Sequence, residues 1–220
     1  MPYRRTENVA RRLAARHDAI LAAARTAARE GGMAAVQIVP VAALASIAAG
    51  TVYRYFAGKT ELVAAVLAQI RASEIAALQA AAGRAPGPLS ALAATIMTFA
   101  ARAMSERRLM FAAIAEPVDA AVDGERQILR QALAEEFATR IKAAVAGGHL
   151  PAQDAVLSAA ALVGLLVEVL IGPLARDASA GEREAVQTAT LLGLRMLGVA
   201  DARARGLVVQ TAVPSGDGAA

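Results

Sequence analysis

The chain has 220 residues, of which 57% are apolar and 3% aromatic, and it carries a net charge of +4 with no cysteine. This apolar content excludes a wholly disordered chain, and the lack of cysteine excludes disulfides, thiolate metal sites and cysteine nucleophiles. Alanine is abundant and runs of β-branched or aromatic residues are short, so helix is favoured over strand nearly everywhere.

Four helices are predicted in the first part of the chain from the spacing of apolar residues. Gly31-Gly32 stops the first helix, which could begin earlier, and Pro40 fits the first turn of the second. A break at Ala57-Gly58 leads into the fourth helix, and the loop GRAPGP at residues 83–88 ends it. The predicted ranges are 18–29, 38–45, 49–56 and 59–82.

Five further helices are predicted over residues 89–103, 107–115, 125–146, 155–172 and 182–198. We expect Pro117 to end the second of these and Pro173 to end the fourth. Residues 201–220 are expected to form a disordered tail. No alternating strand pattern, heptad run or fixed repeat is present, so the prediction is an all-α chain of about nine helices.

The positive charge is concentrated in the first quarter of the chain. Residues 1–62 hold nine Lys or Arg against four Asp or Glu, whereas residues 63–220 hold fourteen against fifteen. A basic module on a near-neutral body is the charge pattern of nucleic-acid binding, although a solvated basic tail gives the same count. Five arginines near the start can likewise either contact DNA or be solvated in a tail, namely Arg4, Arg5, Arg11, Arg12 and Arg16.

Residues 38–56 have the local pattern of a helix-turn-helix, in which two short helices are joined by a three-residue turn. Val52 and Phe56 share one face of the second helix and are expected to pack on Ile20, Ala24, Val41 and Ile47. The opposite face then presents Thr51, Tyr53 and Arg54 to the major groove, where Arg54 can pair with a guanine. Lys59 begins the next helix and can bind phosphate together with the helix dipole.

The stretch VAALASIAAGTVYRYFAGKTEL at residues 41–62 resembles the helix-turn-helix of the TetR family of bacterial transcriptional regulators. Residues of the same or similar type stand at Ala42, Ala45, Gly50, Thr51, Tyr53, Phe56, Lys59 and Leu62. The likeness covers about residues 18–66 and is weaker beyond. Four positions depart from the family pattern by losing a turn glycine or a helix cap, namely Gln37, Ser46, Ala48 and Gly58.

This resemblance implies a homodimer that binds a near-palindromic operator on double-stranded DNA, represses transcription and is released by a small-molecule effector. The basic N-terminal residues lack the apolar segment and cleavage site of a secretory signal, so we expect a cytoplasmic protein. It implies a DNA-binding domain at residues 1–62, connected by the helix at 59–82 to an effector-binding and dimerisation domain at 63–200. The implied DNA contacts are Gln37, Ala49, Gly50, Thr51, Tyr53, Arg54, Tyr55 and Lys59.

Methionine and phenylalanine side chains in the middle of the chain are ordinarily core residues, and in a domain that also holds an effector some of them can line a cavity. Glu168 is the one ionisable residue within the apolar run at 155–172, where it needs either a structural partner or a ligand. The predicted effector-pocket residues are Phe99, Met104, Met110, Phe111, Ile114, Phe137, Ile141 and Glu168.

The apolar run at residues 155–172 is long enough to suggest a membrane-spanning helix, but Glu168 and the flanking Asp154 weaken that interpretation. A helix that is apolar all round also suits the core of a dimer, where small residues permit close approach. The predicted dimer contacts are Ala160, Val163, Gly164, Val167, Ala189, Gly193 and Met196. A non-DNA carrier of apolar ligands and a membrane-associated protein are the alternatives to a regulator.

Catalytic and metal-binding patterns are absent from the sequence. His17 and His149 are isolated from each other and from other ligands at metal spacing, and neither GxGxxG nor a P-loop occurs. We therefore expect no enzyme activity, no metal site and no cofactor.

Overall fold

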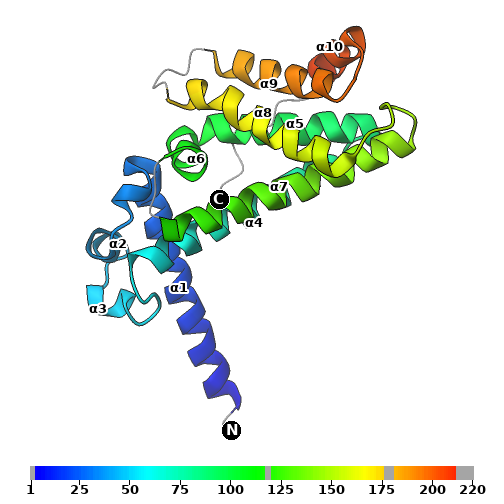
Figure 1. The fold of residues 1–220 in the computed structure, drawn as a ribbon. Helices are drawn as coiled ribbons and strands as arrows, with labels where there is room; N and C mark the ends of the chain where they lie inside the picture. Colours follow the sequence, from blue (N-terminus) through cyan, green and yellow to red (C-terminus); the bar gives the residue numbers. More distant parts are fainter. Residues whose placement is uncertain (1–2, 117–119, 176–180, 212–220) are drawn as a thin grey trace.

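The computed structural model describes residues 3–116, 120–175 and 181–211. These residues form ten α-helices, one short 3₁₀ helix and no strand, which confirms the all-α prediction (Figure 1). The helices are α1 (Tyr3–Gly31), α2 (Ile38–Leu44), α3 (Ala49–Val52), α4 (Lys59–Gly83), α5 (Pro88–Ser105), α6 (Arg107–Ile114), α7 (Ala120–Ala146), α8 (Ala155–Ala175), α9 (Glu182–Met196) and α10 (Asp201–Gln210), and the 3₁₀ helix η1 is Met33–Ala35.

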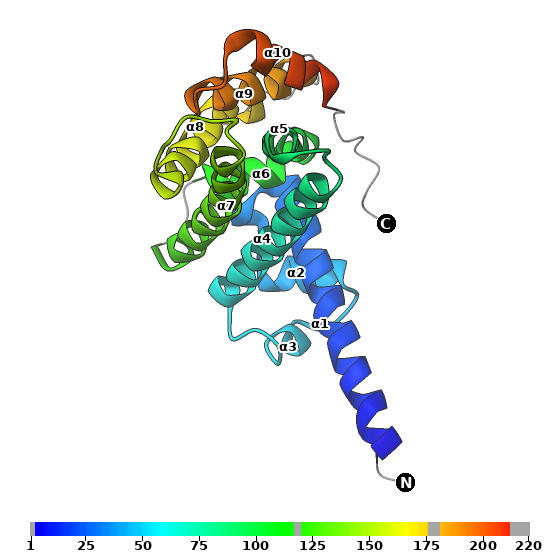
Figure 2. The same cartoon turned by 90° about the vertical axis from the view of Figure 1, so that its right-hand side faces the viewer.

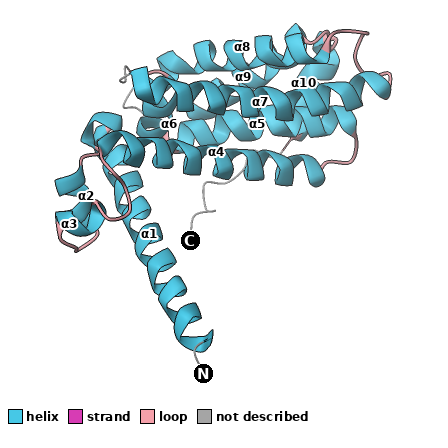
Figure 3. Ribbon diagram, turned by 60° about the horizontal axis from the view of Figure 1, so that its bottom comes forward, coloured by secondary structure: helices cyan, strands magenta, loops and turns pink. Residues whose placement is uncertain are grey.

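The helices divide into a head, which is α1 to α3 with η1, and a body, which is α4 to α10. Figure 1 shows the head at one end of the molecule and α8, α9 and α10 at the other, with α4 running from the head along the body. In Figures 1 and 2 the N-terminal part of α1 projects well beyond the rest of the head. Figure 3 shows the body as a bundle of roughly aligned helices with α4, α5 and α7 packed together.

The core of the head is the one expected from helical spacing. Val52 is fully buried and Phe56 is 3% exposed, and both belong to one apolar cluster with Ile20, Ala24 and Val41. Ile47 is only partly buried against this cluster. Each fully buried large apolar side chain contributes about 1.5–3 kcal/mol, so these few residues hold α1, α2 and α3 together.

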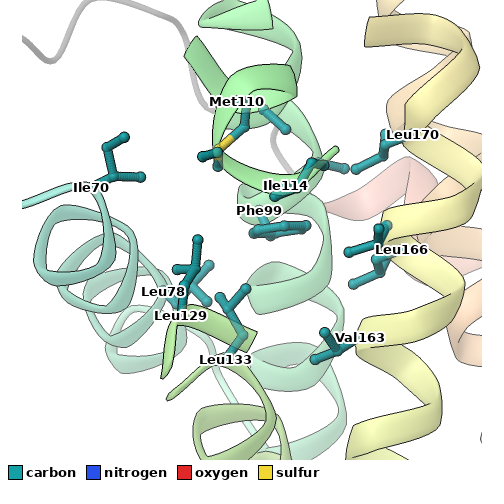
Figure 4. Close-up of a cluster of buried hydrophobic side chains, with 14 of the residues drawn as sticks. Ile70, Leu78, Phe99, Met110, Ile114, Leu129, Leu133, Val163, Leu166 and Leu170 are labelled. Carbon is teal, nitrogen blue, oxygen red and sulfur yellow. The ribbon is translucent and has the colours of Figure 1, made fainter. Parts of the chain in front are cut away.

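The core of the body gathers side chains from five helices around Phe99 of α5 (Figure 4). Met110 and Ile114 of α6 approach it from one side, and leucines of α7 and α8 approach from others. Phe99 is 1% exposed and Met110 and Ile114 are each 3% exposed. Because α6 contributes to this cluster and also borders the head, it connects the interior of the body to the head.

Several predicted boundaries are wrong. The expected tail contains α10, in which Ala204 and Val208 are buried one helical turn apart. The first helix was expected to start at residue 18 or earlier, and α1 begins at Tyr3. Pro173 lies inside α8 instead of ending it, since only two residues follow in the helix and few hydrogen bonds are lost. The predicted helix end at Pro117 and the tail residues 212–220 lie outside the described residues.

α8 is the one described helix that is long and apolar enough to cross a membrane by length and composition, with a mean hydropathy of 2.4. One stripe of it is buried against α7, α9, α6 and α5. The buried stripe consists of Ala155, Ala159, Leu162, Val163, Leu166, Val167, Leu170 and Leu174. The opposite stripe is exposed, so α8 forms a wall of the body with one apolar face uncovered.

Candidate nucleic-acid interface

The turn between α2 and α3 is built around Ser46, which has a left-handed backbone with φ of 53°. The Ile47 N–H donates to the Ala42 carbonyl at 2.9 Å, and the Ser46 N–H donates to the Ala43 carbonyl at 3.0 Å. This pair of bonds is the Schellman pattern, which satisfies the last carbonyl groups of a helix. The helices α7 and α9 end in the same way, but with glycine at the left-handed position, Gly148 and Gly198.

Ser46→Gly is expected to stabilise the protein. A side chain in the left-handed region costs about 1–2 kcal/mol, and the greater freedom of glycine in the unfolded chain offsets about 0.4–1 kcal/mol of that relief. The remainder corresponds to a rise in Tm of about 1–4 °C for a chain of this length. Thermal unfolding followed by circular dichroism measures it, with Ser46→Val as the variant expected to lower Tm. A lower Tm for Ser46→Gly would show that the turn is not strained.

The recognition segment is shorter as a helix than the predicted range 49–56. α3 ends at Val52, and the next residues continue in hydrogen-bonded turns. The Tyr53 N–H donates to the Ala49 carbonyl at 3.2 Å and the Tyr55 N–H donates to the Val52 carbonyl at 2.9 Å. The helix ends early because the chain must reverse through Ala57 and Gly58 to enter α4, but these turns keep the outward face intact.

Six of the eight predicted DNA contacts lie in this segment, around the buried Val52 and Phe56, while Gln37 precedes α2 and Lys59 begins α4. Gln37, Gly50, Tyr53 and Arg54 are exposed, and Ala49, Thr51, Tyr55 and Lys59 are half-buried. Tyr53 exposes 58% of its surface, which is unusual for an aromatic side chain in a small domain. Within the described residues neither Arg54 nor Lys59 makes an ion pair, so both charges are free to meet an external anion.

The helix caps that the sequence lacks are also missing in the structure. Gln37, Ala48 and Gly58 precede α2, α3 and α4, and none of them makes a side-chain capping bond. The Gln37 amide instead donates to the Ala34 carbonyl at 2.9 Å. The Glu61 carboxylate in the first turn of α4 accepts the Ala57 N–H, which orders the loop in front of Lys59. The amide end of α4 therefore faces the same side as the recognition segment, with Lys59 at its start.

Two glutamates join the head to the body, and sequence reasoning missed both. Glu106, between α5 and α6, accepts from Arg29 Nη2 at 2.7 Å and from Arg25 Nη2 at 2.9 Å. Burial alone would raise the pKa of Glu106, but the hydrogen bonds and charges of the two arginines outweigh it and lower that pKa. Glu116, just after α6, accepts the Met33 N–H at 3.0 Å. No sequence signal could have found these pairs, because their members lie about eighty residues apart.

The second link requires glycine at position 32. Gly32 has φ of 74°, and a Cβ there would lie 2.3 Å from a carboxylate oxygen of Glu116. The Glu116 carboxylate can therefore approach the backbone of η1 only where no side chain intervenes. The backbone of Glu116 and the end of α6 are bound in turn to α7. The Arg126 guanidinium of α7 donates to the Glu116 carbonyl at 2.6 Å and to the Ala113 carbonyl at 2.9 Å. α6 is thus tied to α7 as well as to the head.

Seven of the eight predicted effector-pocket residues lie in or beside the interior of the body. Phe99, Met104, Met110, Ile114, Phe137 and Ile141 are buried there, and Phe111 is partly buried against them. Glu168 is exposed on the outer stripe of α8, so its expected burial is wrong. Only one side of α8 is covered by other helices, and Glu168 lies on the uncovered side. Its carboxylate lies away from the interior where the remaining seven gather.

The predicted dimer contacts divide in the same way. Ala160, Gly164 and Met196 are exposed, whereas Val163, Val167, Ala189 and Gly193 are buried within the chain. The last four cannot form an outer surface, which corrects the expected set. Gly193 shows why: a Cβ there would lie 2.9 Å from Leu162, so its small size serves the packing of α9 on α8 within one chain. The outward stripe of α8 is Leu157, Ala160, Ala161, Gly164, Glu168 and Gly172.

Comparisons with known proteins agree with this arrangement. A family profile described as bacterial regulatory proteins, tetR family, matches residues 20–66. No curated protein sequence matches the chain.

Among solved structures, RolR in complex with resorcinol has a TM-score of 0.70 at 22% identity, over 94% of this chain and 98% of that one. SmeT, the repressor of the Stenotrophomonas maltophilia multidrug efflux pump SmeDEF, has a TM-score of 0.70 at 20% identity, over 90% and 96%. The fatty acid degradation regulator FadR from Bacillus halodurans has a TM-score of 0.70 at 17% identity, over 82% and 97%. Identities this low establish a shared fold over nearly the whole length.

Proposed function

We propose that the chain is a DNA-binding transcriptional regulator of the kind described by the tetR-family profile that matches residues 20–66, and that it acts as a cytoplasmic homodimeric repressor released by a small molecule. The observation that carries the proposal is the outer face of the recognition segment, where Tyr53 and Arg54 are exposed and Arg54 has no acidic partner among the residues that the structure describes. An unpaired arginine on a helix-turn-helix can reach guanine O6 and N7 in the major groove. The same segment is anchored from behind by Val52 and Phe56.

The direct test is binding to double-stranded DNA. Purified protein is mixed separately with the DNA fragment upstream of its own coding region and with a random-sequence duplex. The affinity for each is measured by gel shift over a range of salt concentrations. We expect a preferred site and an affinity that falls steeply with salt, since phosphate contacts release counterions. Binding to neither duplex would favour the alternative of an apolar-ligand carrier or membrane-associated protein, and the latter would also need detergent to stay in solution.

The proposed dimer uses the exposed stripe of α8. This stripe carries Leu157, which is 69% exposed, beside the small residues Ala160, Ala161 and Gly164. Small residues let two helices approach closely, and an apolar face left uncovered on one chain is covered by a second copy. Two heads held about 34–36 Å apart can then enter successive major grooves, as a near-palindromic operator requires.

The proposed release couples the interior of the body to the head through α6. Met110 and Ile114 of α6 point toward Phe99, where an effector would have to displace apolar side chains (Figure 4). A shift of α6 moves Glu106 and Glu116 with it, and these residues hold the head. α4 would follow, since it packs on α1, and its tilt would change the separation of the heads. RolR was solved with resorcinol, so a small aromatic compound is a reasonable first probe.

Glu106→Gln is expected to loosen the head from the body without touching the recognition segment. The variant leaves Arg25, whose side chain is only 15% exposed, without its counterion. Partly buried charged pairs of this kind contribute about 1–2 kcal/mol, which corresponds to a fall in Tm of about 2–8 °C. Faster hydrogen exchange in α1 near Arg25 should accompany it. Glu30→Gln, an exposed neighbour in α1, is the matched control.

The pH dependence of this link has a definite sign. Because the folded pKa of Glu106 lies below its ordinary value, the link contributes its full stability above the unfolded pKa near 4.5. That contribution is lost as the pH falls through the folded pKa. The Tm difference between the native chain and Glu106→Gln should therefore be constant at neutral pH and shrink only in acid. A difference that grew on acidification would contradict the charge-based link.

A further inference from the structure

Among the described residues, no other part of the chain covers the N-terminal part of α1. Residues 8–16 are all exposed, and Figures 1 and 2 show this segment extending beyond the head. An isolated helix of this length is marginal in water. The segment therefore gains little stability from the chain itself and is available to an external partner, and we call it the projecting helix.

The chemistry of the projecting helix selects an anion as that partner. Its sequence NVARRLAARH contains three arginines and no acidic residue. Arg11 bonds to the neutral amide of Asn8, while Arg12 and Arg16 have no ionic partner among the described residues. Arg12 and Arg16 are one helical turn apart, where like charges repel and weaken a free helix. A polyanion lying across both would remove that repulsion.

The position of the projecting helix places these arginines beside the recognition segment. The His17 ring stacks on Phe56 with centroids 5.2 Å apart and contacts Tyr55 at 6.4 Å. α1 therefore passes the end of the recognition segment at residue 17. At a rise of 1.5 Å per residue, Arg12 lies only about 8 Å further along the helix axis. Figures 2 and 3 show the N-terminus of α1 and α3 at the same end of the molecule.

The contact depends on nearness along the axis and not on a shared face of α1. His17 is the residue that meets the recognition segment, and Arg16 lies about 100° and Arg12 about 140° from it around the helix axis. The two arginines therefore stand on the flank of α1. A duplex touching Tyr53 and Arg54 would have to pass along this flank, within reach of the long arginine side chains.

We propose, resting on the DNA-binding function above, that the projecting helix is a second DNA-contacting surface, in which Arg12 and Arg16 bind backbone phosphates flanking the bases read by Arg54. A helix about 10 Å or more across cannot enter a minor groove about 6 Å wide. The contact is therefore to phosphates and carries affinity but no sequence preference. Pairing with a second copy through the exposed Val9 and Leu13 is less favourable, because it would bring the arginines of both copies together.

The test compares Arg12→Ala/Arg16→Ala with Arg84→Ala/Lys142→Ala, a control that removes two exposed, unpaired positive charges from the body. The probes are a duplex selected by the native protein from a random pool and a random-sequence duplex of equal length. We expect the first variant to weaken both complexes by the same factor and to shorten the footprint at its outer edge. Its salt dependence should be shallower by about 1.8 per protomer, since each phosphate contact contributes about 0.9 to the slope.

Each other outcome has a definite meaning. Arg12→Lys/Arg16→Lys should retain most of the slope, because lysine also neutralises phosphate. If both double-alanine variants behave alike while Arg54→Ala still abolishes site preference, the projecting helix inference is wrong and the proposed function stands. If Leu13→Asp lowers the oligomeric state while the slope is unchanged, the helix is a protein–protein surface instead. A native protein that bound no duplex would overturn both proposals.

Discussion

Gly164→Arg is expected to convert the dimer into a monomer and to weaken operator binding strongly. Gly164 lies in the middle of the exposed stripe of α8, and a Cβ at this position meets no atom within 4 Å in the chain. The monomer can therefore accept the new side chain. In the dimer two long arginine side chains would have to fit where small residues let the helices approach closely. This loss of packing, together with the part of the charge repulsion that Glu168 one turn away does not neutralise, costs several kcal/mol. A loss on the order of 1000-fold in dimer affinity follows from about 4 kcal/mol.

Sedimentation of the variant measures this loss, and DNA binding measures its consequence. Linking two heads strengthens binding to a two-site operator by roughly 10²–10⁴ over one head, so the variant should lose about that factor in operator affinity while each single head keeps the base preference of Arg54. Gly124→Arg is the matched control, because Gly124 is an exposed helical glycine of α7 with the same free space. A Gly164→Arg protein that remained dimeric would place the interface elsewhere.

The head was predictable because its determinants are local. The i,i+4 pair Val52 and Phe56 is enough to orient the recognition segment, and their burial confirms which face is inward. The end of α3 was not predictable from propensity, because it depends on how the chain enters α4 after Gly58. The sequence showed only that Ser46 stands where the family pattern has a turn glycine. Its left-handed conformation was not predicted, because it follows from the two hydrogen bonds that close the turn.

The body shows where sequence reasoning fails. An apolar run such as residues 155–172 does not reveal which side of the helix will be covered, so Glu168 was expected inside and Val163 outside. Both positions were decided by how α8 packs on α7, α9, α6 and α5, and an apolar run carries no signal of where these neighbours will lie. The Glu106 links to α1 were missed for a different reason, since a charged pair separated by 81 residues leaves no local pattern.

Arg54→Ala and Lys59→Ala are expected to have different effects on DNA. Arg54 is exposed and unpaired, so its guanidinium is free to read a base edge. Losing one bidentate contact to guanine costs about 1–3 kcal/mol per half-site, and about 1.4 kcal/mol is a tenfold loss of affinity. Random duplex offers no such contact at a fixed position, so it should lose much less. The ratio of specific to random affinity is therefore expected to collapse in Arg54→Ala.

Lys59→Ala should instead weaken both duplexes by the same factor, because Lys59 stands at the amide end of α4 and meets phosphate rather than a base edge. Its salt slope should fall by about 0.9 per protomer, as for one lost phosphate contact. Neither side chain is paired within the described residues, so the Tm of both variants should match that of the native chain. The division of roles between the two residues is refuted if both variants lose specific and random binding in equal proportion, since that would leave sequence reading to other side chains of the recognition segment.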